Sequence, residues 1–377
     1  MEDRKAFSRP LSAPFFRHGD TVRGLMLMQL AALAVIVIFS ACFFGLRVVM
    51  LALSGALGAF AAEFAWQYAA KRDSTVGDMS AVVCGVACAC MLPASSPVWL
   101  PLVAGAFAGA VAKLPFGPLG HSPFSPCAAG TAFAVMLGAT ARASIPYSKS
   151  DEKLWSLLPQ RLFDCPENGI LPVLRDVITP DSVDVLDRLS PLMLLRAGED
   201  PHLSASAILL GGQKGAICAA LVPLVIAGIW LIITRTAAWQ SCAAYTAAVF
   251  VLSFVFKYDG VSGIMSGVYE LVCGCTLFVA LFIVGDTLTA PHTGSGRVIF
   301  GIFTAVLTVI LRRAGALEGA EVFAALLAGA LAPALDSFIH YCRLHNISFT
   351  AAKRSYADAM RRRREKREER GDDAVTR

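Results

Sequence analysis

The sequence predicts an all-α polytopic membrane protein of about ten transmembrane helices, arranged as two five-helix halves. Of its 377 residues, 56% are hydrophobic and 16% are charged, whereas soluble domains carry about 25% charged residues. The mean hydropathy is +0.62. The apolar residues form blocks of roughly 17–27, which is the length that spans a hydrocarbon core as a helix. This pattern excludes a soluble enzyme, a nucleic-acid-binding protein and a secreted disulfide scaffold.

The ten predicted spans are separated by short turns, except after the fifth span. They cover residues 25–43, 46–69, 79–92, 98–112, 125–141, 216–233, 237–256, 260–284, 298–311 and 321–341. The third, fourth and ninth are the shortest for a full crossing. Prolines mark several of the ends, because proline removes a backbone donor and clashes with the preceding turn.

The distribution of Lys and Arg predicts the orientation, because short cytoplasmic loops are enriched in these residues. With a cytoplasmic N-terminus and ten spans, most of the 33 Lys and Arg residues fall inside. Residues 1–24 then form a cytoplasmic arm, residues 25–342 the transmembrane domain and residues 343–377 a basic cytoplasmic tail. We therefore expect a multi-pass protein of the plasma (inner) membrane with both termini in the cytoplasm. The tail is either a solvated anchor or a contact to lipid headgroups.

Residues 143–206 are the one long segment between predicted spans. The segment contains more acidic than basic residues and many prolines. Loops of this length in compact proteins tend to be functional or disordered. We interpret it as an ordered cap on the outer face, with one or two short helices.

Most of the 11 cysteines lie inside apolar blocks. Cys88 and Cys90, and likewise Cys273 and Cys275, are two residues apart and point in different directions on a helix. Such cysteines usually behave as small hydrophobic side chains, so the sequence predicts no metal centre.

Three acidic residues occur within predicted spans, namely Glu63, Glu270 and Asp336. An acid at membrane depth is costly unless it is paired, so each is a candidate for the ion path. Glu270 lies deepest in its span, and we expect its carboxyl to face a polar partner or cavity. Glu63 and Asp336 lie near span ends, where a simple interfacial position is the alternative.

Two irregular segments, residues 113–126 and 285–297, are rich in glycine, proline and hydroxyl groups and fall at predicted cytoplasmic ends. Irregular backbone near membrane depth is tolerated where protein or a cavity covers it. One such segment in each half indicates a repeated or inverted architecture with a site between the halves. Lys113, Asp286 and Thr289 are the candidate cofactor-binding residues of that site. Exposed turns are the alternative interpretation.

Several stretches, in order along the chain, resemble one family of membrane subunits. They are Glu63-Phe-Ala-Trp-Gln, Trp99-Leu-Pro-Leu-Val, Lys113-Leu-Pro-Phe-Gly-Pro-Leu-Gly-His-Ser-Pro, Ile283-Val-Gly-Asp-Thr-Leu-Thr-Ala-Pro and the stretch from Leu317 to Asp336. The family comprises the D subunit of Rnf electron-transport complexes and the B subunit of sodium-translocating NADH:quinone reductase. The resemblance covers about residues 15–342, and the chain length is more similar to the Rnf D subunit.

The resemblance implies a flavin cofactor. In this family flavin mononucleotide (FMN) is attached through its phosphate to the threonine of a Ser-Gly-Ala-Thr-Pro-Leu motif in the outer loop. Ser190, followed by Pro and Leu, stands at that place here, whereas Arg188 and Leu189 replace the Gly-Ala pair. Polar residues of the family are also replaced near Thr131 and at Ala219. Three outcomes stay open: FMN on Ser190, a noncovalent flavin such as riboflavin, and a subunit without flavin.

The function implied by the resemblance is that of a membrane subunit of an ion-translocating oxidoreductase. Such an Rnf-type complex couples electron transfer between ferredoxin and NAD to the movement of Na⁺ or H⁺. The partners implied are the other Rnf-type subunits and the lipid bilayer, with no nucleic acid. The alternative is a flavin-free scaffold subunit, or a small-solute permease, on the same fold.

Overall fold

The computed structural model describes residues 21–70, 76–94, 96–116, 122–137, 192, 195, 208–209, 216–258, 261–315 and 319–344. Within these residues the chain is an all-α bundle that has two isolated β-bridges and no strand. The expected arm, outer loop and tail lie largely outside the described residues, as does Ser190.

The first half of the bundle contains five helices. They are α1 (Val22–Phe44), α2 (Arg47–Ala70), α3 (Ser80–Cys90), α4 (Trp99–Phe107) and α5 (Pro126–Met136). A short turn, η2 (Val76–Asp78), precedes α3, and α4 continues through a π-helical turn, η3 (Ala108–Lys113), into η4 (Leu114–Phe116).

The second half begins at η7 (Ile217–Ala219) and continues with α10 (Leu221–Ile233) and α11 (Trp239–Val255). Its third segment is broken into α12 (Gly263–Val272), α13 (Thr276–Val279) and the π-helical turn η8 (Ala280–Val284). The helices α14 (Gly294–Ala314) and α15 (Ala320–Leu344) complete the half.

Local sequence explains where several helices start and stop. Thr21, Ser262 and Thr293 cap α1, α12 and α14, because each side-chain oxygen accepts a hydrogen bond from a backbone N–H three residues later. Gly315 ends α14 with a φ of 127°, a conformation that favours glycine.

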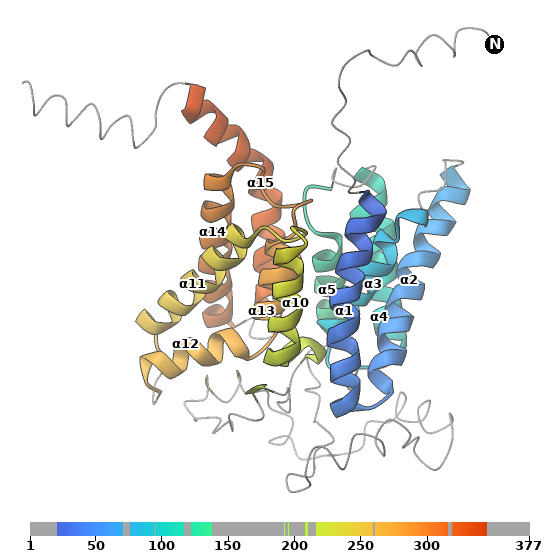
Figure 1. Cartoon of the computed structure of the whole chain (residues 1–377), viewed down its shortest axis with the longest axis horizontal. Coiled ribbons are helices and arrows are strands. Elements are labelled where there is room, and N and C mark those ends of the chain that lie inside the picture. The colour runs from blue at the N-terminus through green and yellow to red at the C-terminus, as the bar shows by residue number, and fades with distance from the viewer. Residues whose placement is uncertain are drawn as a thin grey trace, which may run out of the picture.

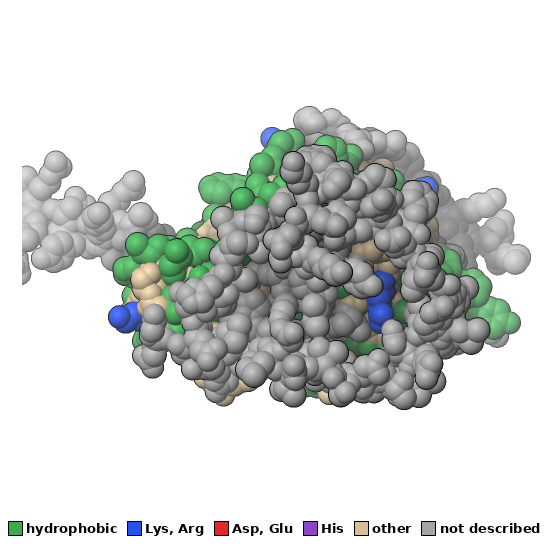
Figure 2. Space-filling view, turned by 90° about the horizontal axis from the view of Figure 1, so that it is seen from below, with side chains coloured by type: hydrophobic (Ala, Val, Ile, Leu, Met, Phe, Trp, Pro, Cys, Tyr) green, Lys and Arg blue, Asp and Glu red, His purple; other side chains and the backbone are tan. Residues whose placement is uncertain are grey.

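The described helices confirm an all-α polytopic membrane protein. Five are long and apolar enough to cross a membrane, the bent pair α12 and α13–η8 adds a sixth, and four shorter apolar helices accompany them. These ten segments coincide with the ten predicted spans. Hydrophobic side chains cover the flanks of the bundle, as Figure 2 shows from the end where α12 lies.

Two predicted spans differ from the structure. The span predicted over residues 260–284 is not one helix, because the chain bends by 63° between α12 and α13, where Gly274 has a φ of 82°. The ninth span is longer at both ends than the predicted 298–311, so Arg312 lies inside α14.

The two halves show similar internal packing. The second and fourth segments of each half, α2 with α4 and α11 with α14, make the most extensive contacts. Both pairs approach closely at a glycine, because a Cβ on Gly58 would clash with the Leu102 carbonyl and one on Gly301 with the Ser241 carbonyl. In Figure 1, α1 runs from the top of the bundle downward, whereas α10 runs upward. The halves are therefore inverted relative to each other.

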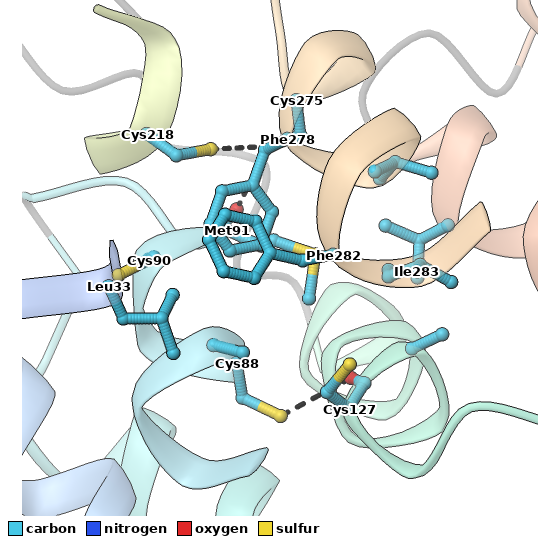
Figure 3. Packing of buried hydrophobic residues seen from close by; sticks show 14 of the residues in the cluster. Leu33, Cys88, Cys90, Met91, Cys127, Cys218, Cys275, Phe278, Phe282 and Ile283 are labelled. Carbon is cyan, nitrogen blue, oxygen red and sulfur yellow. Dashed lines mark hydrogen bonds between the residues drawn. The ribbon is translucent and has the colours of Figure 1, made fainter. Parts of the chain in front are cut away.

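The largest hydrophobic core lies where the halves meet. Leu33 of α1, Cys90 and Met91 at the end of α3, and Phe278 and Phe282 of the second half are buried together there (Figure 3). Both ends of the described chain, at Thr21 and Leu344, lie on the same side of the bundle (Figure 1). The chain leaves α5 and enters η7 on the opposite side.

Candidate functional site

A cavity of about 90 Å³ lies at the junction of the halves, near the starts of α1, α3 and α5, where Gln29, Ser80 and Ser125 line it. Both halves contribute polar groups to its wall. The first half provides Gln29, Ser80, Cys84, Lys113, Ser125 and Cys127, and the second half provides Asp286 and Thr289. The structure thus brings together three of the four candidate cofactor-binding residues, because Lys113 of the first half lies beside Asp286 and Thr289 of the second. The fourth candidate, Ser190, lies outside the described residues. The volume is enough for a few water molecules or a cation.

Asp286 is the acidic residue of this wall. It follows η8, outside the spans, and accepts hydrogen bonds from the Leu288 N–H at 3.2 Å and the Thr289 hydroxyl at 3.4 Å. Burial raises the pKa of the Asp286 carboxyl to about 6, although these hydrogen bonds and one from Gln29 favour its charged form. A carboxyl with this pKa exchanges its proton close to neutral pH.

Lys113 connects the cavity to Glu63. Its Nζ lies 2.8 Å from Oε2 of Glu63 and donates to the Ser80 hydroxyl at 2.7 Å. The Gln67 side chain donates to the other Glu63 oxygen at 3.1 Å. Glu63 is buried and Lys113 is 11% exposed, so the cation that neutralises Glu63 also charges the cavity wall. Glu63 therefore forms a buried ion pair beside the cavity, close to the end of α2.

The break between α12 and α13 carries a second charged cluster, at the opposite end of the bundle (Figure 1). Arg312 of α14 forms a buried ion pair with Glu270, and its second nitrogen lies 3.3 Å from Oε2 of Glu321. Tyr258 donates to the other Glu270 oxygen at 2.7 Å. The polar partner expected for Glu270 is therefore Arg312, and lipid does not reach this carboxyl.

The same cluster satisfies the backbone groups that the helix break exposes. Arg312 donates to the carbonyls of Glu270 at 2.8 Å and Cys273 at 3.4 Å, at the C-terminal end of α12. Glu321 accepts from the N–H of Cys275 at 2.9 Å, at the start of α13. A cation at a helix C-terminus and an anion at an N-terminus both oppose the helix dipoles. The cluster thus stabilises the interruption.

Sequence reasoning did not identify Arg312 or Glu321. The predicted ninth span ends one residue before Arg312, and the predicted tenth span begins at Glu321, so both residues are placed at the water boundary. The hydroxyl of Thr276, which accepts from Arg312 at 2.6 Å, has no distinguishing pattern around it either. The one sequence feature that could have indicated Arg312 is the Arg312-Arg313 pair at the end of an apolar helix.

Asp336 joins α15 to the segment before α14. Its carboxylate accepts hydrogen bonds from the backbone N–H of His292 at 2.9 Å and from the Thr293 hydroxyl at 3.1 Å. Thr293 in turn caps α14. Asp336 therefore positions the irregular segment that follows Asp286 and does not line the cavity.

The predicted attachment residue Ser190 lies outside the described residues. Its near neighbour Leu192 is described and buried in a small cluster with Tyr258, Tyr269 and Cys273. A Cβ on Gly274 would meet Leu192, Arg312 and Glu321 together. Leu192 thus packs against the break between α12 and α13.

Comparison with known proteins assigns this arrangement to a family. The sequence profile of the NQR2, RnfD, RnfE family matches residues 11–344. The D subunit of the ion-translocating oxidoreductase complex of Ectopseudomonas mendocina is 27% identical over 332 residues, which are 87% of this chain and 93% of the relative. The D subunit of the proton-translocating ferredoxin:NAD(+) oxidoreductase complex of Clostridium ljungdahlii is 26% identical over 330 residues, with coverage of 87% and 93%. The D subunit of the Na(+)-translocating ferredoxin:NAD(+) oxidoreductase complex of Acetobacterium woodii is 25% identical over 331 residues, with coverage of 87% and 92%.

Proposed function

The chain belongs to the NQR2, RnfD, RnfE family, and from this membership we propose that it is the D-type membrane subunit of an Rnf-type complex. Such a complex couples electron transfer between ferredoxin and NAD to the movement of Na⁺ or H⁺. The observation that carries the ion-translocating role is the cavity between the halves, where Asp286, Thr289 and Lys113 meet. The other Rnf-type subunits are its partners in the membrane.

The translocated ion enters the subunit at the cavity. The Asp286 carboxylate, the Thr289 hydroxyl and the Gln29 amide offer oxygen atoms, the ligands that hard cations such as Na⁺ prefer. Because the Asp286 pKa is about 6, a proton competes with a metal cation for the same carboxylate. Glu63 is the first acid beyond the cavity, and movement of Lys113 away from it would expose a second carboxylate to the ion.

The translocated ion leaves the subunit at the Glu270 cluster, which is closed in this structure. A cation cannot approach Glu270 while Arg312 occupies its carboxylate. Discontinuous helices with charged groups at the break are typical of ion and substrate sites in transporters. Asp336 contributes indirectly, through the segment between Asp286 and α14 that it holds.

Flavin is assigned to Ser190 and not to the cavity. A volume of about 90 Å³ is below the roughly 300–1,000 Å³ of small-molecule pockets, so the cavity as it stands does not fit an isoalloxazine ring. Lys113, Asp286 and Thr289 then serve the ion. An FMN joined to the Ser190 hydroxyl by a phosphoester would supply one-electron transfer on the outer face.

Two experiments test these assignments. An affinity-tagged chain, purified from its native membranes, should carry the other Rnf-type subunits, and Asp286→Asn should abolish ion pumping by that complex. Asp78→Asn is the matched control, because Asp78 lies in η2 and does not line the cavity. Isolation without any redox subunit would contradict the Rnf assignment and favour a permease.

The flavin is tested on the denatured subunit, in which only a covalent flavin still fluoresces. Co-expression with a flavin transferase should give a fluorescent band that Ser190→Ala removes and Ser190→Thr keeps. A dark wild-type band would contradict covalent attachment and favour a flavin-free subunit. Recovery of fluorescence in Arg188→Gly/Leu189→Ala/Ser190→Thr would then identify side-chain bulk as the cause.

A further inference from the structure

Two thiols are in contact at the junction of the two halves, and a third lies in the same core. Cys90 ends α3, Cys218 lies in η7 and Cys275 lies at the break before α13 (Figure 3). All three side chains are buried, and all are free thiols. The sulfur atoms of Cys218 and Cys275 are 3.5 Å apart, and the Cys275 sulfur also lies 3.5 Å from the Met91 carbonyl oxygen.

Backbone hydrogen bonds hold the two cysteines in this contact. The N–H of Ile217 donates to the Leu92 carbonyl at 3.0 Å, and the Ser40 hydroxyl donates to the Ile217 carbonyl at 2.8 Å, so η7 is tied to the first half. Cys275 is held in the second half, where its N–H donates to Glu321. The sulfur contact therefore joins a segment anchored on one half to the broken helix of the other.

This contact differs from ordinary thiol packing in the same core. Cys88 donates its S–H to the Cys127 carbonyl at 3.2 Å, which is a common way to satisfy a buried thiol. Cys218 instead faces another thiol. An S–S bond is about 2.05 Å long, so a closing movement of about 1.5 Å between the sulfurs would make the bond.

We propose that Cys218 and Cys275 are a redox-active dithiol. Because both thiols are buried in the hydrophobic core, we assign as the oxidant an apolar two-electron acceptor of the quinone class. It takes two electrons and two protons from the pair, becomes a quinol, and leaves one disulfide between Cys218 and Cys275. The disulfide ties η7 to the α12–α13 break and so fixes the two halves against each other. This site goes beyond the proposed function, because it requires neither a flavin on Ser190 nor an ion in the cavity.

The test uses the full chain in lipid nanodiscs, oxidised with a short-chain quinone or with diamide. Remaining thiols are blocked with N-ethylmaleimide, and the digest is searched by mass spectrometry for peptides linked between Cys218 and Cys275. Both oxidants should produce the linked peptide, and dithiothreitol should remove it. Cys218→Ala and Cys275→Ala should each abolish it, whereas Cys88→Ala, a matched change at another buried thiol, should leave it unchanged.

Oxidised wild-type protein should also unfold at a higher temperature than reduced protein, and Cys218→Ala should lose this difference. Absence of the linked peptide from folded, oxidant-treated wild type would overturn the proposal, whatever the variants do. Formation with diamide but not with quinone would overturn the assigned class of oxidant. A link from Cys275 to Cys90 in place of Cys218 would overturn the assigned pair.

Discussion

Replacing Arg312 by methionine should destabilise the protein more than any other single change in its charged residues. Arg312 is fully buried and donates to Glu270, Cys273, Thr276 and Glu321. Removing one partner of a buried ion pair costs about 3–5 kcal/mol. Two buried carboxylates lose their cation here, so we expect the upper end, about 5 kcal/mol. That loss corresponds to a decrease of roughly 6 °C in Tm for a protein of 377 residues.

The assay is thermal unfolding of the detergent-solubilised chain, followed by tryptophan fluorescence. Arg313→Met is the matched control. Its guanidinium lies over the Tyr258 ring at 3.8 Å and at the partly exposed end of α11, so its loss should lower Tm by no more than about 2 °C. The triple variant Arg312→Met/Glu270→Gln/Glu321→Gln removes all the charges and should recover more than half of the lost stability. An Arg312→Met protein as stable as wild type, or a triple variant no better than the single one, would refute the electrostatic argument.

Three further predictions address the cavity, the helix break and the topology. Burial raises the Asp286 pKa from 3.8 to about 6, so the stability that this group contributes is complete below pH 3.8 and is lost as the pH rises through about 6. The Tm of wild type should therefore fall relative to that of Asp286→Asn across this interval. Parallel plots of Tm against pH for the two proteins would contradict the raised pKa. Gly274→Ala should cost roughly 1–3 kcal/mol because its φ is 82° and its Cβ would press on Arg312 and Glu321, whereas Gly77→Ala, with open space around it, should leave Tm unchanged. An impermeant thiol reagent should label Cys165 in intact cells, and reporter fusions that place Arg361 outside would contradict the orientation.

Hydropathy alone was enough to predict the fold class and the ten helical segments. The reason is physical: a span must be apolar over a length that the bilayer sets, and this condition is local in sequence. The break at Gly274 was missed because both α12 and α13 are apolar, so their hydropathy profile is continuous across the bend. What holds the bend is Arg312, a residue of another helix, and no local pattern reports it.

The candidate site was predicted in part. Glycine, proline and hydroxyl groups marked the two irregular segments, and the structure places Lys113, Asp286 and Thr289 around one cavity. The partner of Glu63 could not be predicted, because Lys113 lies 50 residues away and meets it only through the packing of α2 against η3. Composition indicates which residues are costly to bury, whereas tertiary packing decides how each is neutralised.

The two charged pairs differ in a way that bears on transport. In each half the fourth segment supplies the cation of the ion pair, Lys113 after α4 and Arg312 in α14. Because the halves are inverted, these two cations lie at opposite ends of the bundle. Lys113 borders a cavity, whereas Arg312 is fully buried. Inverted repeats with a site between them are typical of secondary transporters, and here one of the two pairs borders a cavity while the other is fully buried.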